Sequence, residues 1–348
     1  MLSSIVTGLA GEYPIQQAIV CLNNHFDPDL VRKIRALDID VRILKKWKLI
    51  TGIDLIQTWW WLRRNDFDVS VTFLFFADVI GLLLSRLSGI TWRLSSQESS
   101  NQHYKGWHCV VLRYCLRLAD VVVLNSDSYK EELRRYIPSR SKIQVIPNGV
   151  IVSKHQRAQS EFDIKRELKL AEDVYLIGSI GRLSSEKGLD VLIDALQRMD
   201  CARVHLAVIG DGEGISDLQV DVEKRGLRDQ VHFLGYRTDI KKLLTNLNVL
   251  VQPSRFEGMP MTVLEAMAVG CPIIATRVGA IPQMIRDGVD GWLVRSEDPK
   301  QLAVIIKGVL EDPIEAGKRA ASAQIRLKER FAFDSSLRAW ERLLSEGK

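Results

Sequence analysis

The sequence predicts an α/β protein built from two doubly wound domains with parallel sheets. Short runs of β-branched residues alternate with amphipathic stretches of helical length, a pattern typical of parallel strands joined by crossover helices. The chain has 348 residues, 46% of them hydrophobic and 26% charged, which is enough for two cores. This composition excludes a disordered or collagen-like protein. Five widely spaced cysteines exclude a disulfide framework and favour the reducing cytoplasm.

The first domain begins in an unusual way. In residues 1–14, Leu2, Ile5, Val6 and Leu9 recur at helical spacing. A doubly wound domain normally opens with a strand and a glycine-rich turn. We therefore expect this helix to be the first one of a domain that lacks its first strand. Either the encoded start lies downstream of the ancestral one or the gene is truncated.

Six strands are predicted in the rest of the first domain. The apolar stretch 69–84 is interrupted by Asp78 and is shorter than the ~20 residues that span a bilayer. It is interpreted as a strand that leads into a helix at 77–88, and no signal peptide precedes it. The predicted strands are residues 17–22, 41–44, 69–75, 91–95, 121–125 and 143–146.

The second domain follows the same pattern more regularly, after a polar linker at 147–160. An amphipathic segment at 333–344 is expected to pack back on the first domain. The predicted domains are therefore residues 1–152, with a returning helix at about 331–348, and residues 153–330. The predicted strands are residues 174–180, 204–209, 231–234, 249–251, 272–276 and 291–294, and the helices are 189–198, 216–225, 239–246, 262–269 and 281–286.

The net charge of +5 arises entirely in the first half, because residues 1–150 contain 19 basic and 14 acidic residues. The excess suits an anionic surface or substrate, but it is too small and too scattered for a nucleic-acid partner. The six histidines are dispersed and have no zinc-site spacing.

Two cations follow the first strand of the second domain, in the segment Gly178-Ser-Ile-Gly-Arg-Leu-Ser-Ser-Glu-Lys-Gly188. The carboxyl end of a parallel strand faces the binding crevice, so Arg182 and Lys187 are well placed to bind phosphates. The alternative is a loop whose charges are simply solvated.

Two acids lie in Arg-Phe-Glu-Gly-Met-Pro-Met-Thr-Val-Leu-Glu-Ala-Met-Ala. Glu257 belongs to the loop after the strand at 249–251, and Glu265 falls in the first turn of an apolar helix. Free N–H groups at that helix start favour an anion. The structural alternative for Glu265 is a capping box with Thr262, and the two roles are compatible.

Two further patterns suggest other chemistries. The loop Gly210-Asp-Gly-Glu-Gly214 resembles a dinucleotide fingerprint but lacks the full Gly-x-Gly-x-x-Gly form, so it indicates only a tight turn near a ligand. Asp-x-Asp triplets at 27–29, 38–40 and 66–68 suggest a metal-dependent transferase. Three occurrences look like chance, and the third precedes its strand, so we expect no metal site.

The second half carries a series of short motifs in a defined order. They are Gly181-Arg182 with Lys187, Gly210-Asp211-Gly212, Phe233-Leu-Gly-Tyr236, Gln252-Pro-Ser254, Glu257-Gly258-Met-Pro260, Glu265-Ala-Met267, Gly270-Cys-Pro-Ile-Ile-Ala275 and Gly288-Val-Asp-Gly291. Taken together, these motifs resemble those of group 1 (family 4) glycosyltransferases. Weaker matches in the first half are 67–69, 77–79, 125–126 and 147–149.

The resemblance implies a GT-B architecture of two Rossmann-like domains, with a nucleotide-sugar held mainly by the second. Arg182 and Lys187 would neutralise the departing diphosphate, Glu257 would contact the donor sugar, and Glu265 would bind the ribose hydroxyls. Further donor-binding positions implied by the resemblance are Gly181, Gly210, Asp211, Gly235, Tyr236, Arg237, Gly258, Met259, Pro260, Met261 and Thr262.

The implied reaction is a retaining, metal-independent sugar transfer with no cofactor, to a polysaccharide, oligosaccharide or lipid-linked acceptor in cell-surface glycan synthesis. Whether retention proceeds by front-face attack or through a glycosyl–enzyme is left open. A polar residue of the first domain usually reaches the reacting sugar, and Glu98 and His103 are the candidates, with an ordinary loop role as the alternative. The competing functions are a truncated, weakly active homologue acting as a binding partner and a sugar-nucleotide epimerase.

Consecutive tryptophans at 59–61 raise the question of a membrane. Three indoles in a row cover about 200° of a helix and cannot all face one core. Arg63 and Arg64 follow them, and Lys45, Lys46 and Lys48 precede them. Exposed tryptophan beside basic residues fits peripheral docking on the anionic inner face of a membrane. The alternative is one buried and two half-buried indoles beside a solvated basic face.

Overall fold

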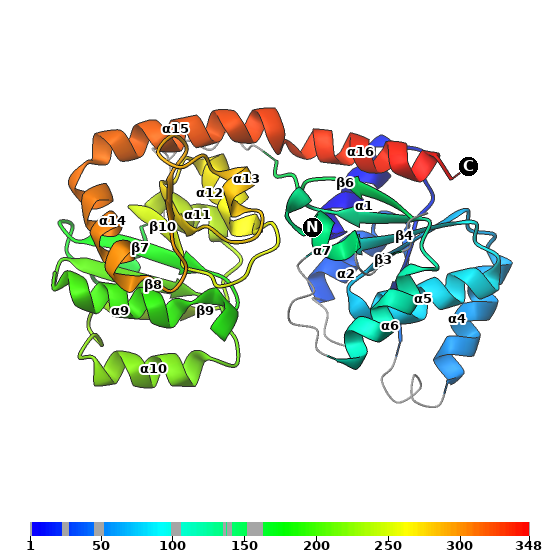
Figure 1. Ribbon diagram of the computed structural model, residues 1–348, viewed down its shortest axis with the longest axis horizontal. Coiled ribbons are helices and arrows are strands. Elements are labelled where there is room, and N and C mark those ends of the chain that lie inside the picture. Colours follow the sequence, from blue (N-terminus) through cyan, green and yellow to red (C-terminus); the bar gives the residue numbers. More distant parts are fainter. Residues whose placement is uncertain are drawn as a thin grey trace. The chain divides into compact units, whose positions relative to one another are not determined.

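The computed structural model describes residues 2–22, 28–44, 52–98, 106–134, 137, 141–151 and 163–347. The chain divides into two compact units, which are described separately (Figure 1). Unit 1 comprises Met1–Asn148 and Asp334–Lys348, and unit 2 comprises Gly149–Phe333. All strand pairs in the described residues are parallel, so the predicted fold class is confirmed.

Unit 1 contains a four-stranded sheet in the order β3-β4-β5-β6 and a separate pair, β1-β2. The six predicted strands are all present, although they form two sheets in the described chain. The strands are β1 (Ala18–Cys21), β2 (Asp40–Ile43), β3 (Val69–Phe73), β4 (Trp92–Gln97), β5 (Val121–Leu124) and β6 (Lys142–Val145). The helices are α1 (Leu2–Glu12), α2 (Pro28–Arg35), α4 (Ile53–Arg64), α5 (Phe75–Ser88), α6 (Trp107–Leu116), α7 (Lys130–Arg134) and α16 (Phe333–Ser345).

Both ends of the chain contribute helices to unit 1. The helix predicted for residues 1–14 is present as α1, which buries Ile5, Val6 and Leu9. The C-terminal helix α16 buries Trp340, whose ring lies 6.0 Å from that of Phe73. Most of α16 is thus part of the core of unit 1, although it follows unit 2 in the sequence.

Unit 2 is one six-stranded parallel sheet in the order β12-β11-β10-β7-β8-β9. Helices α9, α10 and α14 pack on one face, and α11, α12 and α15 on the other. The strands are β7 (Tyr175–Ile180), β8 (Val204–Ile209), β9 (Val231–Gly235), β10 (Val249–Gln252), β11 (Ile273–Thr276) and β12 (Trp292–Val294). The helices are α8 (Ile164–Glu167), α9 (Leu189–Met199), α10 (Ile215–Lys224), α11 (Ile240–Asn246), α12 (Met261–Val269), α13 (Ile281–Met284), α14 (Pro299–Glu311) and α15 (Pro313–Arg330).

The strand order of unit 2 reverses between β7 and β10. From β7 the chain moves outward through β8 to β9, and then returns to the other side of β7 to form β10. At such a switch point the loops leaving the two neighbouring strands diverge, and they leave a crevice at the carboxyl ends of the strands. This is where a doubly wound sheet binds its ligands.

A buried acid in unit 1 makes stability depend on pH. Asp78 is 0% exposed and accepts hydrogen bonds from Thr72 Oγ1 (2.5 Å), Ser95 Oγ (2.7 Å) and Gln97 Nε2 (2.7 Å). Burial raises its pKa to about 6 from an ordinary 3.8, because the charged form loses its hydration. The folded chain therefore holds this proton more tightly than the unfolded chain does, and stability falls as pH rises between these two values.

We expect Asp78→Asn to remove this dependence. Relative to the variant, the wild type should lose about 3 kcal/mol of unfolding free energy between about pH 4 and pH 6, since one unit of pKa shift corresponds to about 1.4 kcal/mol. Urea unfolding of both chains, followed at several pH values, measures the difference in slope. Profiles that run parallel, separated only by a constant offset from the altered hydrogen bonds, would contradict the assignment.

Candidate active site

Three loops meet at the carboxyl ends of β7, β8 and β9, where their backbones are in direct contact. Gly181 N donates to Ile209 O (3.0 Å), and Gly210 N donates to Gly235 O (2.8 Å). A Cβ on Gly210, which has φ 137°, would lie 1.9 Å from Gly181 O. Only glycine fits at position 210. The loops that carry the three predicted donor-binding glycines, 181, 210 and 235, are therefore in direct backbone contact with one another.

The loop after β10 is fastened to the loop after β7 by both backbone and side chains. Arg255 N donates to Glu186 O (2.8 Å), and the Arg255 guanidinium binds Asp190 with both NH groups (2.8 and 2.7 Å). A Cβ on Gly188 would lie 2.3 Å from Pro253 O. These contacts fix the spacing of the two loops that border the switch point.

Lys187 and Glu257 form an ion pair across the switch point. Lys187 Nζ lies 2.7 Å from Glu257 Oε1, and the two side chains are 24% and 5% exposed. The same Oε1 accepts hydrogen bonds from Gln252 Nε2 (2.7 Å) and Ser254 Oγ (2.6 Å). Three donors on one oxygen hold the carboxylate in a single orientation and compensate its burial.

The site also contains polar groups that have no ion-pair or hydrogen-bond partner among the described residues. Arg182 is exposed and forms no ion pair with the described residues. Ser184 Oγ and Gln252 Oε1 are buried and have no hydrogen-bond partner within the described part of the chain. Because buried polar atoms are almost always paired, these atoms indicate that a ligand or water completes the site.

Glu265 lies in the second turn of α12, which differs from the capping-box prediction. The helix begins at Met261 with Pro260 as its N-cap, and no side chain caps it. Thr262 is therefore inside the first turn, and its Oγ1 donates to Ile180 O at 3.5 Å. Burial raises the pKa of Glu265, an effect that nearby Lys241 opposes. The helix start thus keeps free N–H groups at the crevice.

The segment Gly258 to Met261 connects the fixed carboxylate to this helix start. Ala280 N donates to Gly258 O (3.1 Å), which anchors the loop. Met259 is 5% exposed and belongs to the hydrophobic core, so its side chain does not line a polar site. Asp211, in the loop after β8, accepts from Gly212 N (2.8 Å) and shapes its own turn.

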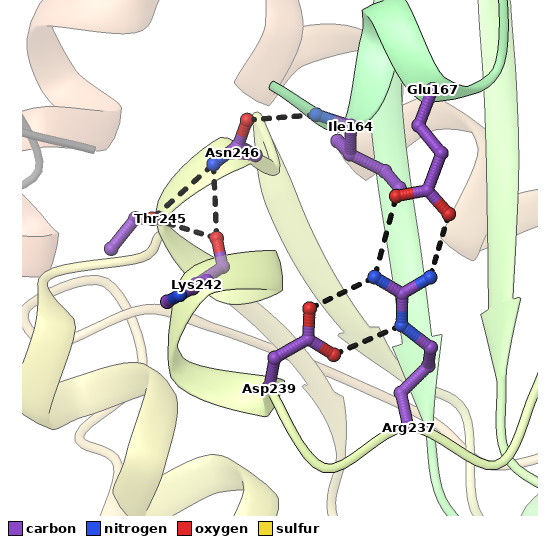
Figure 2. Close-up of polar contacts among 7 residues, drawn as sticks. All are labelled: Ile164, Glu167, Arg237, Asp239, Lys242, Thr245 and Asn246. Atoms are coloured by element: carbon purple, nitrogen blue, oxygen red, sulfur yellow. Dashed lines mark hydrogen bonds and ion pairs between the residues drawn. The ribbon is translucent and has the colours of Figure 1, made fainter. Parts of the chain in front are cut away.

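Arg237 is bound by acids of its own unit, as Figure 2 shows. Its guanidinium donates to Glu167 Oε1 (2.6 Å) and to Asp239 Oδ1 and Oδ2 (2.9 and 2.8 Å), which holds its pKa above the ordinary range. Glu167 belongs to α8, whose Ile164 N donates to Asn246 Oδ1 (3.2 Å). Arg237 therefore fastens α8 to the loop after β9, while neighbouring Tyr236 is 75% exposed.

The candidates from the first domain lie in unit 1 or outside the described residues. Glu98 directly follows β4, where burial raises its pKa and Ser96 Oγ donates to its Oε1 (3.1 Å). Asn125 Nδ2 donates to Glu98 O (2.8 Å), so Glu98 lies where β4 and β5 end. His103 lies outside the described residues, as do Asp27 of the first Asp-x-Asp triplet and Lys45, Lys46 and Lys48.

The acidic triplets do not assemble a metal site in the part of the chain that the structure describes. Within those residues, no group of three or more His, Cys, Asp and Glu side chains lies close enough to hold a metal ion. Asp66, in the third triplet, has a φ of 45° in the turn that precedes β3.

No role was predicted from the sequence for three residues of this site, although Gln252 and Ser254 belong to a motif that carries the family resemblance. Gln252 and Ser254 orient Glu257, and Ser184 contributes a buried hydroxyl. Gln252 and Ser254 lie at the carboxyl end of β10, and this position in the sequence could have marked them as site residues. Their polar side chains follow a fully buried strand and therefore face the crevice.

Two family models match the chain. Residues 160–326 match the model described as Glycosyl transferases group 1, and residues 15–154 match Glycosyltransferase Family 4. Together the matched segments include most of both units.

Individual relatives agree with this assignment. The lipopolysaccharide core biosynthesis mannosyltransferase LpsB of Rhizobium meliloti is 27% identical over 74% of this chain and 73% of its own length. The UDP-Gal:alpha-D-GlcNAc-diphosphoundecaprenol alpha-1,3-galactosyltransferase of Escherichia coli is 24% identical over 86% of this chain and 84% of its own. The crystal structure of Anabaena Alr3699/HepE in complex with UDP-glucose has a TM-score of 0.87 at 22% identity, covering 99% of this chain and 94% of that one, which shows the GT-B fold.

Proposed function

Because this chain belongs to the group 1 glycosyltransferases, we propose that it moves a sugar from a nucleoside-diphosphate sugar to a glycan or lipid-linked acceptor, with retention of anomeric configuration. The single observation that carries the proposal is the Lys187–Glu257 pair at the switch point of unit 2. It combines a cation for a diphosphate with a carboxylate for sugar hydroxyls.

The charges of the site suit a departing diphosphate. Lys187 and Arg182 supply two cations, and the start of α12 supplies free N–H groups. In the reaction the bond between the sugar and the diphosphate breaks, and negative charge develops on the leaving oxygen. Fixed cations stabilise that charge more than they stabilise the intact donor, and this difference lowers the barrier.

The two acids have different proposed partners. Glu257, oriented by Gln252 and Ser254, accepts hydrogen bonds from hydroxyls of the donor sugar. Glu265 accepts from the ribose hydroxyls. Glu98 of unit 1 is proposed to contact the acceptor or the reacting sugar.

The donor, the absence of cofactors and the location are also parts of the proposal. The HepE complex with UDP-glucose supports a UDP-sugar as the first donor to test, with GDP-sugars as the next. The two cations Arg182 and Lys187 support a reaction without a metal, and no cofactor is invoked. The LpsB relative and the E. coli galactosyltransferase support an acceptor in cell-surface glycan synthesis. The five widely spaced cysteines support the cytoplasm.

A donor screen tests the proposal. The purified chain is incubated with UDP- and GDP-sugars, in the presence of EDTA, and with soluble and lipid-linked glycan acceptors. We expect nucleotide release and a product whose anomeric configuration equals that of the donor. An inverted product, activity abolished by EDTA, or epimerisation of the donor without transfer would each overturn a stated part of the proposal.

Tyr236 and Arg237 are expected to differ in their effects on nucleotide binding. Tyr236→Ala should weaken UDP binding about tenfold, because an exposed ring next to the crevice can stack on the base. Arg237→Lys loses the fork that joins Glu167 and Asp239, so it should lower the melting temperature and change UDP affinity less than about threefold. Calorimetry and thermal melts measure both; a selective loss of UDP binding in Arg237→Lys would instead indicate a direct contact between the guanidinium and the nucleotide.

A further inference from the structure

Three neighbouring helices of unit 1 expose apolar stripes. Helix α5 packs against both α4 and α6, so the three lie side by side (Figure 1). On each helix, three large apolar residues at intervals of three, four or seven face solvent. They are Ile53, Ile56 and Trp60 on α4, Phe76, Leu83 and Leu87 on α5, and Trp107, Val110 and Tyr114 on α6, and each is 43–66% exposed.

Helix α4 has its polarity inverted. Its buried residues are Asp54 and Thr58, while Ile56 and Trp60 are 60% and 51% exposed. Helix α5 also buries a charged residue, Asp78, and exposes Leu87 to 56%. A water-facing helix surface is normally polar, so apolar stripes on three adjacent helices indicate a surface that something else covers.

The tryptophan triplet contributes to this surface differently from the sequence hypothesis. Only Trp60 is mostly exposed, while Trp59 and Trp61 are half-buried. Trp59 Nε1 donates to Leu87 O (3.1 Å), and the Trp61 ring lies 5.1 Å from Phe67. The apolar surface therefore extends across α5 and α6, where no sequence pattern had suggested it.

The charges on the same helices are of one sign. Both acids of the three helices, Asp54 and Asp78, are buried. Five arginines are exposed, and none of them pairs with a carboxylate among the described residues. Two arginines lie against exposed rings, Arg64 at 5.5 Å from Trp60 and Arg117 at 5.0 Å from Tyr114. The five are Arg63, Arg64, Arg86 and Arg113 on the helices, and Arg117, which directly follows α6.

We propose that the solvent faces of α4, α5 and α6 form a docking surface for an anionic lipid bilayer. Aromatic rings and arginines together are the side chains favoured at the level of lipid headgroups, where the ring enters the interface and the guanidinium binds phosphate. Among the described residues, none of the helices combines the length and the apolar character of a membrane span. This inference rests on the proposed function in one respect, because a lipid-linked acceptor explains why the enzyme binds a membrane. The docking surface brings the enzyme to that acceptor.

Vesicle sedimentation tests the docking surface. The full chain is mixed with vesicles of phosphatidylcholine alone and with vesicles that also contain phosphatidylglycerol, at low and high salt. We expect binding to the anionic vesicles only, weakened by salt because surface charges are screened. Equal binding to both kinds of vesicle, or to neither, would overturn the proposal.

Two triple variants identify the surface. Arg64→Gln, Arg86→Gln and Arg113→Gln together should weaken binding about a hundredfold, since each basic residue near an anionic surface contributes about a fivefold gain. The matched control replaces Lys224, Lys300 and Lys307, three exposed lysines of unit 2, with Gln and should bind like the wild type.

Replacing Ile56, Trp60 and Leu87 with Ser should weaken binding by at least about tenfold, the amount expected for lost apolar burial. Its control changes Val304, Ile314 and Ile325, which are 70%, 72% and 59% exposed in unit 2. Unchanged vesicle binding in either surface variant contradicts the assignment, as does a wild-type dimer that the apolar variant dissociates. UDP titration of the same samples separates the two proposals, because a chain that binds UDP but no vesicle refutes only the docking surface.

Discussion

Replacing Lys187 with alanine is expected to lower kcat/KM for the sugar donor by about a hundred- to a thousandfold. The ammonium group lies at the switch point, 2.7 Å from Glu257, and removing one fixed group that stabilises developing charge has typical effects of this size. Lys187→Arg retains the charge and should lose much less. Lys224→Ala removes an exposed lysine of the same unit on α10 and serves as the matched control.

The loss must be separated from unfolding, because Lys187→Ala leaves the buried Glu257 carboxylate without its cation. Breaking such a pair costs about 3–5 kcal/mol of stability. The double variant Lys187→Ala/Glu257→Gln removes both charges and should recover most of the melting temperature. If the double variant were as active as Glu257→Gln alone, Lys187 would be only a structural partner of Glu257, and the proposed contact with the diphosphate would be wrong.

Glu257→Gln is expected to impair recognition of the donor sugar while leaving the binding of the nucleotide intact. A hydrogen bond to a charged acceptor contributes about 1.5–3 kcal/mol, so kcat/KM should fall about ten- to a hundredfold. The affinity for UDP, which carries no sugar, should stay within about threefold or increase, since Lys187 then has no competing partner. Calorimetry with UDP beside steady-state rates with the sugar donor measures this difference.

Glu186→Gln is the control for Glu257→Gln, since Glu186 is an exposed acid next to Lys187. Its side chain should matter little, because its contacts to the loop after β10 are made by the backbone carbonyl. An equal loss of UDP and sugar-donor binding in Glu257→Gln would contradict the assignment of Glu257 to the sugar.

The central strands β5, β10 and β11 were predictable from the sequence because their residues are mostly apolar. All four residues of β5 are buried, as are those of β10 and β11, and short apolar runs of this kind are typical of strands inside a parallel sheet. Helices α14 and α15 lie outside the predicted elements. The buried positions of α15 include the small residues Ala316, Ala320 and Ala323, which give a weak amphipathic signal.

The site was predictable in its residue types but not in its pairings. Lys187 and Glu257 are 70 residues apart and meet only because β10 lies beside β7, on the side opposite β8 and β9. Local spacing carries no information about that order. The ion pairs of Arg237 were unpredictable for the same reason, because Glu167, one of the two acids that bind it, is also 70 residues away.

The capping-box prediction failed on a local detail. Pro260 serves as the N-cap and places Thr262 two residues after the N-cap position, inside α12, where it cannot act as a side-chain cap. Proline is compatible with a helix start, so the sequence alone could not distinguish these two starts.

The measurement that tests the central claim most directly is a calorimetric titration of UDP and GDP into the wild-type chain and into Lys187→Ala. We expect a saturable isotherm with one site per chain for at least one of the two nucleotides, in the presence of EDTA, and a loss of that isotherm in the variant. If neither nucleotide bound the correctly folded wild-type chain, or if Lys187→Ala bound as tightly as the wild type, the proposed diphosphate site at the ends of β7 and β10 would be contradicted.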